Sequence, residues 1–201
     1  MKQNSIVTTF LGCMLLAWAC ISLAAESKPP SAATSAPGQP ITAAEQSRLL
    51  YCTSLSIDAY VIAGYKLHGD PKQVAKDFYA SSPSAHALLP LVDTIYGDAS
   101  VRDPWSYAGA FYQDCAEQLA MIAPDRSALT VPCLYETLIA ATARTARAAG
   151  TPKQKVYALY ADLGLKARRI IDGIYAPATV PAEGTELQLY SSCMVPLSTK
   201  D

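Results

Sequence analysis

The sequence predicts an all-α protein built from two tandem, disulfide-stabilised units of about four helices each, related by internal duplication. Three observations lead to this prediction. The chain repeats itself, four cysteines bracket the repeats, and no run of residues alternates apolar and polar with the period of two that strands require. The repeat is clearest at residues 69–73, GDPKQ, which return at 150–154 as GTPKQ, each seventeen residues after a cysteine.

The duplication rests on identities that keep their order along both copies. A shift of 81 residues superimposes Cys52 on Cys133, Ala59 on Ala140, Gly69 on Gly150 and Tyr79 on Tyr160. After short gaps, VDTIY (92–96) falls on IDGIY (171–175), and Cys115 falls on Cys193. We therefore predict one repeat unit over residues 42–122 and a second over 123–201.

The N-terminus has the form of a signal peptide, predicted over residues 1–25. Lys2 is the only charge before an uncharged, largely apolar run that ends in the small residues Ala24 and Ala25. An uncleaved membrane anchor is the competing interpretation, since the run approaches the roughly 20 residues that span a bilayer. Lipidation at Cys20 is a weaker alternative, because a bulky tryptophan stands two residues earlier, where a small residue is expected.

The segment that follows, residues 26–41, is rich in Pro, Ser and Ala and is predicted to be a disordered linker. With the signal peptide removed, no membrane span is expected. The protein is therefore expected in the periplasm or outside the cell.

Four cysteines remain after the leader, an even number that implies disulfides in an exported chain. Because each repeat opens with one cysteine and closes with another, the simplest pairing is Cys52 with Cys115 and Cys133 with Cys193. Pairing between the units is the open alternative. Each bond within a unit would close a loop of about 60 residues, worth on the order of 4 kcal/mol in the loop-entropy model.

Local signals place the helices. Thr42 and Glu45 have capping-box spacing, which predicts the start of the first helix. Gly69 and its counterpart Gly150 are suited to end a helix with positive φ. Asp70 is then expected to cap the next helix, with Pro71 at its first position, and Thr151 and Pro152 do the same in the second unit.

Third helices are expected over about 84–96 and 163–175. Fourth helices are expected from about Asp103 or Pro181 to the closing cysteines. The segment 123–132, with prolines near both ends, is expected to join the two units.

The sequence offers little for catalysis. His68 and His86 are the only histidines, and neither has the spacing of a metal site, so no catalytic, cofactor or metal residue is predicted. One enzymatic alternative is a cleft between the units lined by Asp93, Asp172, His86 and Tyr96. The two carboxylates occupy equivalent positions, however, which favours structural salt bridges or hydrogen bonds repeated in each unit.

Charge is divided unequally. The mature chain has 15 basic and 17 acidic residues, which predicts no general affinity for nucleic acid or anionic membranes. Between its cysteines the first unit carries a balance of −3 and the second +2. A solvated face is one interpretation of this difference, and a basic face that binds an acidic patch on a protein partner is the other. The residues of that face are Arg144, Arg147, Lys153, Lys155, Arg168 and Arg169.

The cysteine near the start of each unit, the Gly-x-Pro turn, the Ile-Tyr pair and the final aromatic residue before the closing cysteine resemble exported helical modules found as tandem copies in uncharacterised proteobacterial proteins. Two copies would cover residues 45–195. The chain is also similar, in being small, helical and disulfide-bonded, to periplasmic immunity proteins of type VI secretion systems. We therefore predict a periplasmic protein-interaction module, with an immunity-type inhibitor of a cell-wall hydrolase toxin as the alternative.

Overall fold

The computed structural model describes residues 39–176 and 184–198, and within these ranges the protein is all-helical. The predicted signal peptide, Cys20, Pro181 and all of the predicted linker before Gln39 lie outside the described residues. The described α-helices are α1 (Ala43–His68), α2 (Lys72–Ala80), α3 (Ala85–Gly97), α4 (Pro104–Gln118), α5 (Pro124–Ala148), α6 (Lys153–Leu159), α7 (Gly164–Tyr175) and α8 (Thr185–Met194). Two short 3-10 helices, η1 (Ala161–Leu163) and η2 (Val195–Leu197), complete them.

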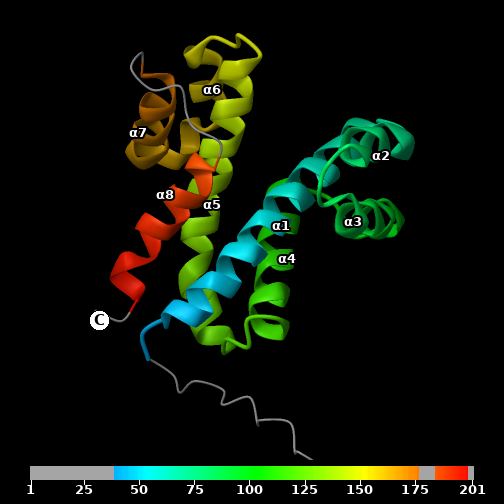
Figure 1. Ribbon diagram of the computed structural model, residues 1–201. Helices are drawn as coiled ribbons and strands as arrows, with labels where there is room; N and C mark the ends of the chain where they lie inside the picture. Colours follow the sequence, from blue (N-terminus) through cyan, green and yellow to red (C-terminus); the bar gives the residue numbers. More distant parts are fainter. Residues whose placement is uncertain (1–38, 177–183, 199–201) are drawn as a thin grey trace, which may run out of the picture. The chain divides into compact units, whose positions relative to one another are not determined.

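The two longest helices, α1 and α5, organise the fold (Figure 1). Helix α4 packs against α1 and α5, while α8 packs against α5 and α1. Helices α2 and α3 gather at the C-terminal end of α1, and α6 and α7 gather at the C-terminal end of α5. We call α1–α4 the first half and α5–α8 the second half.

Both predicted disulfides are confirmed. Cys52 in α1 is bonded to Cys115 in α4, and Cys133 in α5 is bonded to Cys193 in α8. Each bond therefore joins the first helix of a half to its last helix. The two bonded loops follow one another along the chain without overlapping.

The capping box at the start of α1 is also confirmed, since Glu45 N donates to Thr42 Oγ1 at 3.2 Å and Thr42 N donates to Glu45 Oε2 at 2.8 Å. The predicted linker is already part of the fold at its last position, one residue earlier than expected. Ile41 is buried, and its N–H donates to the carbonyl of Leu197 at 2.7 Å. An isolated parallel bridge joins Ile41 to Ser198.

The GDPKQ turn is only partly as predicted. Gly69 ends α1 with φ of 88°, in the left-handed region, as expected. The predicted cap was wrong, because Pro71 occupies the N-cap position of α2 and no side chain caps the helix. Asp70 instead accepts a hydrogen bond from Tyr96 on its backbone carbonyl at 3.0 Å. Thr151 accepts the equivalent bond from Tyr175 at 2.8 Å, and Pro152 is the N-cap of α6.

The expected connection over residues 123–132 was wrong as well. These residues form the cap and first turns of α5, which begins at Pro124 and contains Pro132 in its interior. Pro124 stands in the first turn, where its missing N–H has no helical partner to lose. In the turns of α5 before Pro132, two hydroxyls bond to backbone carbonyls: Ser127 Oγ donates to Pro124 O at 3.0 Å, and Thr130 Oγ1 donates to Ser127 O at 2.7 Å.

Three clusters of buried side chains hold the helices together. The central cluster lies among α1, α4, α5 and α8, where Tyr112 and Tyr190 are fully buried with their hydroxyls 2.5 Å apart. A second cluster lies under α2 and α3, and a third under α6 and α7. Trp105 packs against both the central and the third cluster and stacks on Tyr135 with ring centroids 5.3 Å apart.

Candidate functional site

Two arginines of the predicted basic face contribute to the fold instead of to an open surface. Arg144 Nη2 lies 2.9 Å from Glu186 Oε1, which ties α5 to α8. Arg147 donates to the carbonyl of Ile174 near the end of α7. Carbonyls in the last turn of a helix lack helical partners, so a cation there satisfies a bonding need of the fold. Lys66 makes the matching bond in the first half, to Ile95 O at 2.9 Å.

Lys153 is also engaged. Its Nζ lies 2.7 Å from Asp172 Oδ1, and the Tyr157 hydroxyl donates to the same carboxylate oxygen. The hydrogen bonds from Lys153 and Tyr157 lower the pKa of Asp172, and the bond to Asp172 raises the pKa of Lys153. Lys153 and Asp172 therefore connect α6 to α7 at the surface, as structural salt bridges were expected to do.

The remaining three basic residues of the predicted face, Lys155, Arg168 and Arg169, are exposed. The guanidinium carbon of Arg168 lies 5.8 Å from the centre of the Tyr157 ring, which orients it by a cation–π contact. Lys155 belongs to α6 and the two arginines to the second turn of α7. Of the six predicted residues, three therefore bond to other helices of the protein and three face solvent.

Three exposed leucines lie between these basic residues. Leu159 ends α6, Leu163 lies in η1 and Leu165 begins α7, with exposed fractions of 69%, 46% and 71%. None of them belongs to a buried cluster. We call the set formed by Lys155, Leu159, Leu163, Leu165, Arg168 and Arg169 the α6–α7 surface.

The sequence reasoning missed these leucines, although a signal was available. The buried residues of α7 are Ala167, Ile171 and Ile174. At 3.6 residues per turn, Leu165 lies on the opposite side of the helix from Ala167, so an apolar residue there cannot join the same core. A leucine on the wrong face of an amphipathic helix was therefore visible before the structure.

The alternative of a catalytic cleft is not supported by the positions of its four residues. Asp93 lies between Lys72 and Lys76, at 2.9 and 2.8 Å, and Asp172 is held in the other half. Figure 1 shows their helices, α3 and α7, on different sides of the α1–α5 pair. His86 is exposed, and the Tyr96 hydroxyl is used by Asp70 O. Hydrogen bonds from Lys76 and Lys72 lower the pKa of Asp93, which opposes a role as a general acid.

One carboxyl group with a raised pKa was not predicted. Burial raises the pKa of Asp58 in α1 to about 6, and a hydrogen bond from Tyr79 of α2 partly opposes that rise. No lysine, arginine or histidine among the described residues lies within 4.0 Å of this carboxylate. At the position 81 residues later stands Ile139, so the acid occurs in the first half alone.

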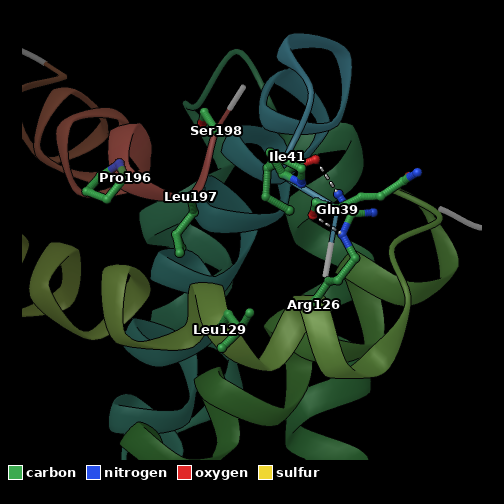
Figure 2. A pocket seen from close by; sticks show the side chains of 8 residues that line it. Gln39, Ile41, Arg126, Leu129, Pro196, Leu197 and Ser198 are labelled. Atoms are coloured by element: carbon green, nitrogen blue, oxygen red, sulfur yellow. Dashed lines mark hydrogen bonds between the residues drawn. The ribbon is translucent and has the colours of Figure 1, made fainter. Parts of the chain in front are cut away.

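A pocket of about 230 Å³ lies where the two ends of the described chain meet (Figure 2). Its lining is mostly apolar, with Ile41, Leu129 and Leu197 around the opening. Arg126 forms part of its wall and is only 2% exposed. The guanidinium nitrogens of this arginine are hydrogen-bonded to other parts of the fold.

The guanidinium of Arg126 makes a two-pronged ion pair with Glu45, with Nη1–Oε1 and Nη2–Oε2 distances of 2.9 and 3.0 Å. It also donates to the carbonyls of Gln39 and Pro40 at 3.0 and 2.9 Å. Four hydrogen bonds therefore fasten the entering chain and α1 to α5. We interpret Arg126 as a structural clamp and the pocket beside it as a gap between chain ends.

Within the described residues, no group of three His, Cys, Asp or Glu side chains is arranged to hold a metal ion, and no helix combines the length and apolar character needed to cross a membrane. No family model, curated protein or solved structure matches the chain. The α6–α7 surface combines the two most exposed large apolar side chains of the described residues, Leu165 and Leu159, with three exposed cations.

Proposed function

We propose that this protein is an exported binding protein without catalytic activity, and that its α6–α7 surface engages a negatively charged partner in the cell envelope. The observation that carries the proposal is the exposure of three leucines within seven residues, flanked by three exposed basic side chains. Exposed apolar side chains that are concentrated on one short segment are costly in water and are a feature of interaction sites. The sequence-based expectation of a protein partner remains a prediction.

Export is part of the proposal and has two supports. The first 25 residues carry the signal-peptide pattern described above. The two disulfides are of the kind that persist in oxidising compartments, because cytosolic reductants keep most thiols reduced. These two features together support a location in the periplasm or outside the cell.

We also propose that the two halves arose by duplication. Supporting contacts recur at matching positions: Ser56 Oγ donates to Cys52 O at 2.7 Å, and Thr137 Oγ1 donates to Cys133 O at 2.8 Å. The Tyr96 and Tyr175 bonds to the turn carbonyls form a second matched pair. Under this proposal a binding surface on one half is a later specialisation of a shared scaffold.

The test is site-specific photo-crosslinking in the native cell envelope. A photoreactive residue in place of Leu163 should form an adduct with a partner, whereas one in place of Ser82, the position 81 residues earlier, should not. Combining the Leu163 probe with Lys155→Gln, Arg168→Gln and Arg169→Gln should remove the adduct. Equal labelling at both positions, or labelling that survives the charge substitutions, would contradict the proposal.

A further inference from the structure

We infer that the partner of the α6–α7 surface is the anionic surface of a lipid bilayer, to which the protein attaches peripherally. This inference rests on the proposed function and names its partner. It concerns attachment in the plane of the membrane interface, where apolar side chains enter the boundary between headgroups and acyl chains and cations remain among the headgroups. No membrane-spanning segment is involved.

Helix geometry places two of the three exposed leucines beside cations. Lys155 and Leu159 are four residues apart in α6, and Leu165 lies three and four residues before Arg168 and Arg169 in α7. Side chains at these spacings are neighbours on a helix surface. Leu163 lies in the short turn between the two pairs. Apolar groups flanked by long basic side chains are the pattern of an interfacial membrane contact.

The local charge is opposite in sign to that of the whole protein. Residues 153–169 contain five basic side chains and one acidic side chain, Asp162. Two of the five are paired within the fold, Lys153 with Asp172 and Lys166 with Glu136. Lys155, Arg168 and Arg169 outnumber the exposed Asp162. The overall charge thus predicts no attraction to anionic lipid, whereas this segment by itself does.

The composition of the surface favours lipid over protein. Protein interfaces are enriched in aromatic anchors and in arginine and are depleted of lysine, and a stable one buries roughly 800 Å² on each partner. Here the apolar groups are all aliphatic, and Leu165 and Leu159 are the two most exposed large apolar side chains in the described structure. A bilayer accepts small aliphatic projections without requiring a matching shape, so a short segment is sufficient.

The experiment is co-flotation with vesicles of phosphatidylcholine alone or with about 30 mol% of the anionic lipid phosphatidylglycerol, which gives the vesicle surface a negative potential. The chain is purified after export with both disulfides formed, and it carries Cys20→Ala so that no lipid can be attached at that position. Binding to the anionic vesicles is expected to exceed binding to the neutral ones at least tenfold, and to fall sharply in 1 M salt, where charges are screened beyond about 3 Å.

Substitutions separate the contribution of the cations to vesicle binding from that of the leucines. Lys155→Gln, Arg168→Gln and Arg169→Gln together should weaken binding on the order of a hundredfold, at roughly fivefold for each cation. Leu159→Ser with Leu165→Ser should weaken it at least tenfold. The matched control is Val74→Ser with Phe78→Ser, which removes apolar groups exposed by 43% and 58% from α2 of the first half and should leave binding within about twofold.

The possible failures are distinguishable. Equal binding to neutral and anionic vesicles, or binding unaffected by the leucine substitutions, would overturn the inference. Absence of vesicle binding together with a charge-dependent protein adduct at position 163 would also overturn it, but would leave the proposed function standing with a protein as partner. Absence of both would contradict the proposed function as well.

Discussion

The same location in the two halves holds opposite charges. Glu45 lies in the first turn of α1, and 81 residues later Arg126 lies in the first turn of α5. These two matching residues meet each other as a buried ion pair. Tyr112 and Tyr190, which precede the closing cysteines by three residues, also meet each other. Corresponding positions therefore contact one another across the centre of the fold.

This arrangement explains where the halves differ. When two equivalent positions touch, identical charged residues would repel, so Glu45 requires a cation as its partner and Arg126 provides it. Tyrosines can remain identical because a hydroxyl both donates and accepts. Away from the centre this constraint is absent and the halves differ, with a half-buried Asp58 in one and exposed leucines in the other. The comparison indicates that the centre requires complementary residues and the periphery does not.

The largest expected effect comes from breaking the ion pair. Arg126→Met leaves the Glu45 carboxylate buried without its cation, which should lower the free energy of unfolding by about 3–5 kcal/mol. Adding Glu45→Leu removes the stranded charge and should recover roughly half of that loss, since the carbonyls of Gln39 and Pro40 still lack their donor and the capping bond from Thr42 N is lost. Chemical denaturation of the three proteins measures both quantities. A cost below about 1 kcal/mol for Arg126→Met would mean that Glu45 reaches water.

The disulfides test whether the halves are energetically alike. Cys52→Ala with Cys115→Ala, and Cys133→Ala with Cys193→Ala, should each destabilise the protein by about 2–4 kcal/mol. Because the bonded cysteines are 63 and 60 residues apart, the loop-entropy cost is nearly the same for both. Thermal unfolding of the two double variants provides the comparison. If the losses in the free energy of unfolding of the two variants differ by more than about 1.5 kcal/mol, one half depends on its disulfide much more than the other.

The smallest expected effect concerns the acid found only in the first half. The pKa of Asp58 is raised to about 6 in the folded protein from 3.8, so between these pH values the folded state holds more protons than the unfolded state. Stability from this group is therefore lost as pH rises from about 4 to 6. After allowance for solvent screening, we expect the free energy of unfolding to fall by about 1–2 kcal/mol over this pH range.

Asp58→Asn should remove this part of the pH dependence while retaining a group that can bond to Tyr79. The measurement is the free energy of unfolding of both proteins at pH 4 and pH 6.5, because subtraction cancels the titration of all other carboxyl groups. Parallel curves for the two proteins would show that Asp58 does not titrate in this range. Ile139→Asn in the second half is the matched control and should leave the pH dependence unchanged.

Much of the scaffold could be predicted because its signals are local or repeated. Gly69 predicts the end of α1 from backbone geometry alone, and the repeat predicts both cysteine pairs. The start of α5 was missed because Pro124 and Pro132 were interpreted as loop residues, although the shift of 81 aligns Ala123 with Thr42 just before α1. A repeat that fixes the register deserves more weight than proline content.

The candidate site was harder to predict, since a charged residue does not reveal whether its partner lies in solvent or in the fold. Arg144 and Arg147 look like Arg168 and Arg169 in the sequence, but α8 and the end of α7 supply partners to the first two. The environment of Asp58 depends likewise on the packing of α2 over α1. Contacts of this kind, between residues of different helices, cannot be predicted from residue spacing or composition.

The order of the disulfides along the chain has a consequence for assembly. Under the proposed export, a chain that crosses a membrane from its N-terminus presents Cys52, Cys115, Cys133 and Cys193 to an oxidase one after another. Because the native bonds join the first to the second and the third to the fourth, each newly arrived pair is the correct pair. The first loop can close while the second half is still being translocated, so that pairing consecutive thiols as they emerge is sufficient to produce the native connectivity.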